Sequence, residues 1–382
     1  MSSITLFMLP EPGHLLPTFR FALALQRRGH VVTYLSIPEF RDTIQSLGFR
    51  FHQVLANRFH DGFDTGTMFD TLDTGAAIYS KITSGFRSPW PTDAVVSDLA
   101  ATSPDLIIID SATVGFGFWS STPGALRRLD CPILRVSATF TEEHRGFPGS
   151  DFESSLPELI LCPREFDLPS SPVAPYQRHF VESSVLTSRP EPQFSWHWID
   201  QSCRLVYCSL GTQSRQYPGA AGTLRKVIEA FRGFDKHQLV INLGGHQSAE
   251  EFGAVPSNVL LQRRVPQASI LQYAATVITH GGLGTIKESI LAAIPLIVMP
   301  FAHDQPQNAN RVAYHRLGLR LDPHPCSAEG LRAAVLNAGG AEIRTQAVNF
   351  QRIFRNAEDR SPSVSHIERF VAQKSTVPAG QS

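Results

Sequence analysis

The sequence predicts an α/β protein with two doubly wound parallel-sheet domains, and three observations support this prediction. Short apolar runs alternate with segments of helical periodicity in both halves of the chain, which is typical of parallel sheets. At 382 residues the chain is too long for one ordinary core and fits two domains of about 150–200 residues each. Between the two patterns, residues 188–198 contain two prolines and three aromatic residues, a composition that indicates a connector.

The composition argues against several classes of protein. The chain is 42% hydrophobic and 18% charged, with 34 basic and 34 acidic residues, which is typical of a soluble globular protein. A surface without net positive charge argues against nucleic acid as a partner. The apolar run at 290–302 contains two prolines and is far shorter than a membrane span, and the N-terminus begins on a strand rather than on a signal peptide.

Cysteine and histidine usage indicates neither disulfides nor a metal site. The five cysteines are odd in number and scattered, at Cys131, Cys162, Cys203, Cys208 and Cys326, and we expect buried free thiols. This suits a reducing, cytoplasmic location. The 14 histidines show no metal-type spacing and no Asp-X-Asp cluster occurs, so we expect no metal cofactor.

In the first half, the order of elements predicts a β-α-β-α-β unit. Apolar strands are expected at 4–9, 31–36 and 49–54, with helices at 17–28 and 39–47 between them. Two further strands are expected at 105–110 and 132–136.

His14 and Asp110 are the candidate catalytic residues of this half. His14 lies in a turn at the carboxyl end of the first strand, where open α/β sheets bind their ligands. Asp110 ends the buried strand at 105–110 and therefore shares that edge; a carboxylate there can fix the imidazole tautomer and stabilise the imidazolium. The alternatives are a solvated His14 and an Asp110 that caps the following helix together with Ser111.

Residues 57–94 form a long aromatic insertion, with a helix expected at 75–83. It is either a substrate-facing loop or a surface excursion. Aromatic residues in this and later loops suggest a pocket for an apolar or aromatic small molecule. The candidate pocket residues are Phe59, Phe63, Trp90, Phe116 and Phe140.

The second half repeats the α/β pattern. Strands are expected at 205–210, 238–242 and 259–262, and helices at 222–233 and 267–274. The first of these strands is closed by Gly211 and Thr212, a small polar turn. The chain then continues with helices from Ala328 and from 341 to about 374, followed by a polar tail that we expect to be disordered.

Segment 277–308 contains the clearest binding signal. A strand at 277–279 enters a helix at 283–293 through glycines, and a second strand follows at 296–299. Glycines there let backbone N–H groups approach an anion, with the positive end of the helix dipole behind them. We therefore predict a nucleotide-diphosphate site; the alternative is that the glycines only form a turn. Its candidate residues are Gly281, Gly282, Gly284 and Thr285 for the phosphates and Glu288 for a ribose diol.

Two polar clusters accompany the helix at 283–293, one before segment 277–308 and one near its end. In Arg264-Val265-Pro266-Gln267 the arginine could stack on a nucleobase and the glutamine could contact a base edge, or the arginine could lie on a solvated loop. Asp304 and Gln305 are equipped to hold neighbouring sugar hydroxyls, or they start a helix.

With these motifs in place, the sequence resembles the nucleotide-sugar-dependent glycosyltransferases of GT-B fold. Within the UDP-glycosyltransferase superfamily it is similar to the macrolide and secondary-metabolite enzymes, over nearly the whole chain. The resemblance implies two Rossmann-like domains that face a central cleft, with the C-terminal helix crossing back to the N-terminal domain. The motifs that carry it are Gly13-His14…Pro17, residues 28–33, Pro104-Asp105…Asp110, Val265-Pro266-Gln267, residues 278–285, Glu288, Pro300, Asp304-Gln305, Asn308-Ala309 and Arg311.

The resemblance implies a role for each matched position. His14 matches the general base that deprotonates the acceptor, and Asp110 matches its orienting acid. Many relatives have tryptophan where this chain has Arg264, so the contact with the nucleobase departs from the family pattern. The donor-site positions are Gly211, Thr212, His280, Gly281, Gly282, Gly284 and Thr285 for the diphosphate, Glu288 for the ribose, Arg264, Val265 and Gln267 for the nucleobase, and Asp304 and Gln305 for the sugar.

The same comparison predicts the domain boundaries. They are an acceptor-binding domain at 1–187, a linker at 188–200, a nucleotide-sugar-binding domain at 201–355, a C-terminal helix at 356–374 on the first domain, and a disordered tail at 375–382.

The expected reaction is a single inverting displacement. A hexose moves from a UDP- or dTDP-sugar to a hydroxyl of an apolar natural product, and the helix at 283–293 rather than a metal meets the leaving-group charge. We expect a monomer or homodimer. The alternatives are a sugar-nucleotide epimerase or hydrolase on the same fold and a non-catalytic nucleotide-sugar-binding protein. An NAD-dependent oxidoreductase is disfavoured because no Gly-X-Gly-X-X-Gly follows the first strand.

Overall fold

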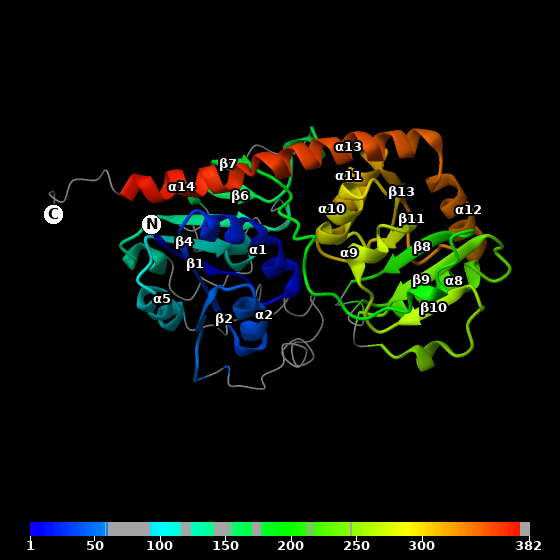
Figure 1. The fold of residues 1–382 in the computed structure, drawn as a ribbon, viewed down its shortest axis with the longest axis horizontal. Coiled ribbons are helices and arrows are strands. Elements are labelled where there is room, and N and C mark those ends of the chain that lie inside the picture. The colour runs from blue at the N-terminus through cyan, green and yellow to red at the C-terminus, as the bar shows by residue number, and fades with distance from the viewer. Residues whose placement is uncertain are drawn as a thin grey trace. The chain divides into compact units, whose positions relative to one another are not determined.

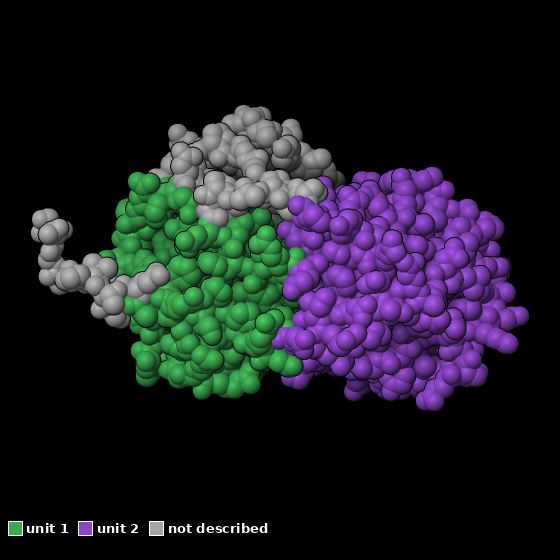
Figure 2. Space-filling model, turned by 90° about the horizontal axis from the view of Figure 1, so that it is seen from above, with its two compact units in different colours: residues 1–164, 170–184, 357–382 green, residues 165–169, 185–356 purple. Residues whose placement is uncertain are grey.

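The computed structural model of the chain (Figure 1) describes residues 1–57, 59, 92–115, 124–140, 152, 155–169, 177–211, 214, 217–244 and 247–374. The chain divides into two units, which Figure 2 shows in different colours. Unit 1 contains residues 1–164, 170–184 and 357–382, and unit 2 contains residues 165–169 and 185–356. Each unit has a parallel sheet of its own.

Unit 1 is built on a sheet of seven parallel strands in the order β3-β2-β1-β4-β5-β6-β7, counted over the described residues. The strands are β1 Ser3–Phe7, β2 Val31–Ser36, β3 Arg50–Gln53, β4 Leu106–Asp110, β5 Ile133–Ser137, β6 Glu158–Ile160 and β7 Arg178–Phe180. The strand order reverses between β1 and β4, so the carboxyl ends of these two neighbours form the switch point where such sheets bind ligands.

The helical segments of unit 1 connect these strands. They are α1 Pro12–Arg27, η1 Pro38–Phe40, α2 Arg41–Ser46, α5 Thr92–Ala101, α6 Ser111–Gly115 and η2 Ala125–Arg128, with η4 Arg164–Phe166 at the boundary. The sequence predicted a helix that begins at Pro17, whereas helix α1 begins at Pro12. Pro12 suits the first turn because its missing N–H would have no helical partner. His14 therefore lies in the first turn of α1, and the predicted helix at 75–83 lies outside the described residues.

The short strands β6 and β7 were not predicted, because charged residues interrupt any apolar pattern in them. Glu158 is fully buried in β6, and the Nε atom of Arg178 in β7 lies 3.3 Å from its carboxylate. Arg135 of β5 lies on the other side of the same carboxylate, at 3.8 Å. A buried carboxylate is tolerated where cations and donors surround it, as here.

Unit 2 has a six-stranded parallel sheet in the order β10-β9-β8-β11-β12-β13, again within the described chain. Its strands are β8 Arg204–Ser209, β9 His237–Asn242, β10 Val259–Gln262, β11 Ala274–Thr279, β12 Leu296–Val298 and β13 Gly318–Arg320. Its helical segments are η5 Trp196–Trp198, α8 Ala220–Ala230, η7 Ala249–Phe252, α9 Gln267–Ile270, α10 Leu283–Leu291, α11 Gln305–Tyr314, α12 Ala328–Ala338 and most of α13 Ala341–Arg360, whose last four residues belong to unit 1. The predicted strands at 205–210, 238–242 and 259–262 are confirmed, and β13 was missed because Gly318 and Arg320 leave it without an apolar run.

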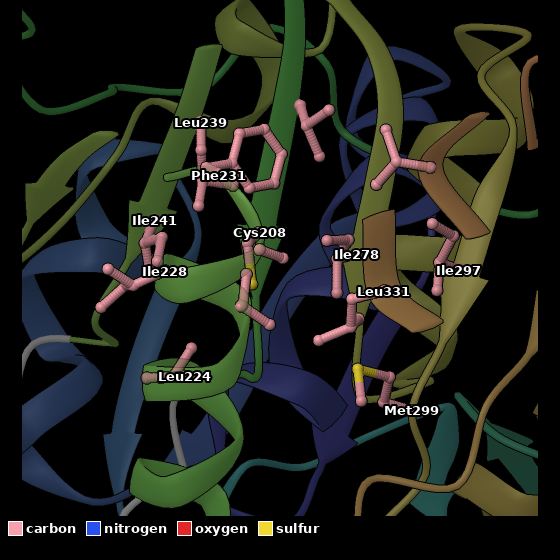
Figure 3. Close-up of a cluster of buried hydrophobic side chains, with 14 of the residues drawn as sticks. Cys208, Leu224, Ile228, Phe231, Leu239, Ile241, Ile278, Ile297, Met299 and Leu331 are labelled. Atoms are coloured by element: carbon pink, nitrogen blue, oxygen red, sulfur yellow. The ribbon is translucent and has the colours of Figure 1, made fainter. Parts of the chain in front are cut away.

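One hydrophobic cluster of unit 2 lies between the sheet and helices α8 and α12 (Figure 3). Because side chains alternate along a strand, Cys208 points into this cluster while Tyr207 points to the opposite face, toward α9. Burial raises the pKa of the Cys208 thiol to about 12. The core side chains labelled in Figure 3 are Cys208, Leu224, Ile228, Phe231, Leu239, Ile241, Ile278, Ile297, Met299 and Leu331.

The C-terminal helical region is broken rather than continuous. Helix α13 ends at Arg360 and α14, Pro362–Lys374, follows after Ser361, whose φ is +43°. Proline cannot donate the helical hydrogen bond and disfavours a helical conformation in the residue before it, which explains the break. Residues from Ala357 onward belong to unit 1, where the carboxylate of Glu182 accepts a hydrogen bond from the backbone N–H of Ser363 at 3.0 Å.

Two further predictions concern the whole chain. All five cysteines are free, as predicted, although only Cys162 and Cys208 are fully buried. Among the described helices, none is both long and apolar enough to cross a membrane.

Candidate active site

In unit 1, the fold brings the two candidate catalytic residues together. The Nδ1 atom of His14, in the first turn of α1, lies 2.9 Å from Oδ2 of Asp110 at the end of β4. The Asp110 side chain is 1% exposed and that of His14 is 16% exposed. The carboxylate is thus shielded from water, whereas the imidazole remains partly accessible to solvent.

Two backbone groups fix the orientation of Asp110. Its Oδ2 accepts a hydrogen bond from the N–H of Leu9 at 3.1 Å, and its Oδ1 accepts one from the N–H of Ala112 at 2.9 Å. The second bond caps the start of α6, so Asp110 caps this helix and contacts His14 at the same time. The two interpretations offered by the sequence are therefore compatible.

A buried polar contact supports the segment that follows Asp110. Ser111 donates a hydrogen bond from Oγ to Oε1 of Glu158 at 2.5 Å, and both residues are buried. Because Ser111 is adjacent to Asp110, this bond ties the end of β4 to the ion cluster on β5–β7. Sequence reasoning missed Glu158, since a lone acid in a short strand gives no recognisable pattern.

The candidate acceptor-pocket residues are only partly within the described chain. Phe59 and Phe140 are 4% and 3% exposed, and the Phe140 ring packs against Phe180 at a centroid distance of 6.3 Å. Phe63, Trp90 and Phe116 lie outside the described residues. Their assignment to an acceptor pocket stays a prediction.

In unit 2, the glycine turn between β11 and α10 has the geometry of a close backbone approach. Gly281 has a φ of +99°, and a Cβ atom there would lie 2.8 Å from a methyl group of Val298. Gly211, at the end of β8, has a φ of +84°, and a Cβ atom there would lie 2.7 Å from the His280 ring. Both positions therefore require glycine, for conformation and for space.

The His280 ring is packed between the two turns. It lies against Gly211 and Gly282, and the ring of Tyr217 stacks on it at 6.1 Å. Burial lowers the pKa of His280 to about 4, partly offset by a hydrogen bond with the backbone of Ser209. At neutral pH the ring is therefore uncharged, and it can serve as a hydrogen-bonding group rather than as a cation.

The N-terminus of α10 lacks a side-chain cap. Gly282 is its N-cap residue, and no acidic side chain occupies the first turn. Space remains around the Cα atom of Gly284, and Thr285 is half-buried in the same turn. An α-helix that begins with uncapped N–H groups beside two glycine turns can bind an anion. Thr212 lies outside the described residues.

Glu288, the predicted ribose ligand, is already held by two side chains. Arg189 of the connector donates to both carboxylate oxygens, Nη1 to Oε1 at 2.7 Å and Nη2 to Oε2 at 2.9 Å. Gln267, the predicted base contact, donates from Nε2 to Oε2 at 3.0 Å, and its Oε1 accepts from the hydroxyl of Tyr207 at 3.0 Å. Nothing in the sequence of the connector indicated a role for Arg189.

The other predicted nucleobase residues differ in their exposure. Arg264 is exposed, as an arginine that stacks on a ligand must be, whereas Val265 is buried. Both precede α9, so they lie at the same end of the sheet as Gln267.

The predicted sugar-binding pair lies at the start of α11. The amide oxygen of Gln305 accepts from the N–H groups of Phe301 and Ala302 at 2.9 and 3.0 Å, and its Nε2 donates to the hydroxyl of Tyr217 at 2.9 Å. The Gln305 side chain is thus turned into its own loop. Asp304 accepts a hydrogen bond from Asn308 at 2.8 Å.

Asn308 links the glycine turn to the start of α11. Its Nδ2 atom donates to the carbonyl of Gly281 at 2.9 Å and to Asp304, and the residue is fully buried. It thereby fixes the glycine turn relative to α11. The sequence motif contained Asn308, but only the structure assigns it this positioning role.

Metal-ligand groups are not gathered anywhere in the described part of the chain: no set of three histidine, cysteine, aspartate or glutamate side chains there could hold an ion.

Comparison with known proteins places these sites in context. The sequence model described as "Erythromycin biosynthesis protein CIII-like, C-terminal domain" matches residues 225–359. The chain is 24% identical to the NDP-glycosyltransferase YjiC of Bacillus subtilis (strain 168), over 98% of each chain. It is 28% identical to the demethyllactenocin mycarosyltransferase of Streptomyces fradiae, over 87% of this chain and 78% of that protein.

A solved structure gives the corresponding result for the fold. The glycosyltransferase VinC in complex with dTDP superimposes with a TM-score of 0.70 at 19% identity, over 97% of this chain and 100% of that chain. This likeness confirms the predicted fold of two parallel-sheet α/β domains.

Proposed function

We propose that this chain belongs to the UDP-glycosyltransferase superfamily and transfers a hexose from a nucleoside-diphosphate sugar to a hydroxyl of an apolar natural product. Two of its sequence relatives are named as glycosyltransferases in general, and two by a specific acceptor, demethyllactenocin or oleandomycin. The donor, the inverting mechanism and the residue roles are our proposal. The observation that carries the mechanism is the 2.9 Å contact between His14 Nδ1 and the buried Asp110.

In this proposal His14 is the general base. Asp110 accepts a hydrogen bond from Nδ1–H, which fixes the tautomer in which Nε2 is unprotonated and can take the proton of the acceptor hydroxyl. The hydroxyl oxygen then attacks the anomeric carbon, the bond to the diphosphate breaks, and the configuration inverts. His14 thus activates the uncharged acceptor hydroxyl as a nucleophile at neutral pH. General-base catalysis of this kind contributes about 10²–10⁴-fold in rate.

The departing diphosphate would be met by the glycine turns and the start of α10. Two observations support this: the uncapped N–H groups at Gly282 and the open space at Gly284. Preorganised N–H donors stabilise developing negative charge without reorganisation. Thr285 and neutral His280 would add hydrogen bonds, and we propose that the reaction needs no metal.

The proposed substrates follow from the relatives. The name NDP-glycosyltransferase and the dTDP bound to VinC support a nucleoside-diphosphate donor, either UDP- or dTDP-linked. The mycarosyltransferase supports a polyketide-like acceptor. No observation favours an epimerase, a hydrolase or a non-catalytic binding protein.

Substitution of His14 tests the proposed base. We expect His14→Ala to lower sugar transfer to a panel of phenolic and polyketide acceptors by about 10²–10⁴-fold, because the acceptor hydroxyl then stays protonated. Binding of UDP and dTDP, measured by calorimetric titration, is expected to be unchanged, since the proposed donor residues all belong to unit 2.

Two further variants complete this test. Asp110→Asn should also lower transfer, because the imidazole loses its carboxylate partner, whereas His52→Ala on strand β3 should retain it. Loss of both transfer and nucleotide binding in His14→Ala would count against the assignment.

A further inference from the structure

The arrangement of donors around Glu288 bears on which nucleoside the donor site accepts, and the argument rests on the proposed function above. Within the described chain, three N–H groups reach its carboxylate: two from Arg189 and one from Gln267. An ionised carboxylate offers about four acceptor positions, two on each oxygen. Oε2 has accepted two hydrogen bonds and Oε1 one, so one position remains, on Oε1.

This arrangement is rigid rather than incidental. Arg189 also donates to the carbonyl of Leu186 at 3.3 Å, and Glu191, two residues further on, accepts from the backbone N–H groups of Ala268 and Ser269 at 2.6 and 3.1 Å. The connector is thereby attached to the start of α9 on one side of Arg189. A guanidinium that forms a fork with a carboxylate gives a strong and geometrically specific pair.

Gln267 is fixed as firmly as Arg189. Its Oε1 accepts from the hydroxyl of Tyr207, which in turn accepts from Nδ2 of Asn242 at 3.2 Å. Tyr207 is fully buried on β8. These hydrogen bonds determine which end of the Gln267 amide faces Glu288. The amide therefore cannot rotate to present its oxygen instead of its N–H group to Oε2.

The two common donor nucleosides differ at the atoms that this carboxylate would bind. A ribonucleotide presents a 2′,3′-diol with two O–H donors, whereas a 2′-deoxyribonucleotide presents the 3′-hydroxyl alone. One remaining acceptor position matches one hydroxyl. A second hydroxyl beside the half-buried Glu288 would find no remaining acceptor position on this carboxylate, or would have to displace Arg189 or Gln267.

We propose that Arg189 is a specificity-determining residue of the donor site, which limits Glu288 to one sugar hydroxyl and so favours 2′-deoxyribonucleoside diphosphates over ribonucleoside diphosphates. Arg189 acts through Glu288 and does not itself take part in the chemistry. The side chains of Arg189 and Glu288 are 22% and 12% exposed, so the pair is accessible to a ligand but shielded enough for an unpaired hydroxyl to be costly.

The test uses four nucleotides that separate the sugar from the base: dTDP, 5-methyluridine diphosphate, dUDP and UDP. Calorimetric titration of the full chain is expected to give about 10-fold tighter binding of each deoxy form than of its ribose counterpart. The comparison within each pair leaves the base unchanged. This ratio in the unmodified protein needs no variant, so it holds even if a substitution impairs folding.

Variants then test whether Arg189 causes the preference. In Arg189→Met and in Gln267→Met the deoxy-to-ribo ratio should fall to within about twofold, because each change frees an acceptor position on Glu288. Arg225→Met, on α8 and bonded to the carbonyl of Glu251, should keep the original ratio.

The outcomes separate this inference from the proposed function. Binding of all four nucleotides with equal affinity, or an unchanged ratio in Arg189→Met, would overturn the inference and leave the proposed function standing. If none of the four binds, the proposed donor site is wrong and the inference is wrong with it.

Discussion

At the scale of single residues, His280 shows how burial sets the properties of the site. Its ring lies against Gly211 and Gly282 and is largely buried, and this burial lowers its pKa to about 4. The unfolded chain has the ordinary histidine pKa of about 6.5. Between these values the unfolded state binds a proton that the folded state does not, so the free energy of unfolding falls as pH is lowered through this window.

This difference predicts a pH-dependent stability. At pH 5 the His280 contribution should be lower than at pH 7 by about 2 kcal/mol. His280→Gln, which does not titrate, should lose correspondingly less stability than the unmodified protein between pH 7 and pH 5. Urea unfolding at the two pH values measures this difference; equal losses in both proteins would show that His280 is not kept neutral by the fold.

The residue scale is also where sequence reasoning was most and least informative. Glycines 211 and 281 could be recognised because a tight turn at a strand end permits few other residues, and His14 and Asp110 because both follow strands that end at one edge. Arg189 could not be recognised, since its role depends on a carboxylate 99 positions away and a proline-rich connector has no periodic pattern. The same applies to Glu158, whose partners lie on other strands.

At the scale of elements, the buried amide of Asn308 links the turn before α10 to α11. Asn308 on α11 connects the Gly281 carbonyl to Asp304, and the glycine turn precedes the first turn of α10. The strands and helices themselves were predicted well where apolar residues follow one another, as in β2 and β12. Strands β6, β7 and β13 each contain a charged residue among only three positions, so no apolar run is visible, and tertiary pairing rather than local propensity forms them.

We predict that Asn308→Ala weakens both the fold and the donor site. Loss of the buried hydrogen bond to Gly281 should lower the free energy of unfolding by about 1–3 kcal/mol. Nucleotide affinity should fall as well, because the turn that approaches the diphosphate loses its anchor. Denaturant unfolding and calorimetric titration measure the two effects.

The control for this prediction lies on the same helix. Asn310 is exposed and bonds to Arg320, so Asn310→Ala should change neither the Gly281 turn nor nucleotide affinity. If Asn308→Ala bound nucleotides as well as Asn310→Ala does, the positioning role of Asn308 would have to be abandoned.

At the scale of the whole molecule, the chemistry is divided between two units. Unit 1 holds the His14–Asp110 pair, and unit 2 holds the glycine turns, Glu288 and the start of α11. The two parallel sheets could be predicted from alternation of strand and helix patterns alone. The break between α13 and α14 was not predicted from the sequence, because the residues on both sides of Ser361 and Pro362 have helical periodicity.

The account as a whole depends on transfer to an acceptor, which one measurement tests directly. Release of nucleoside diphosphate from UDP-glucose and dTDP-glucose is followed with and without a panel of apolar hydroxylated acceptors, in the presence of EDTA. We expect release that requires an acceptor, survives EDTA and yields a glycoside of inverted configuration. Equal release without any acceptor would contradict the account and indicate a hydrolase, and loss of release in EDTA would contradict the metal-free site.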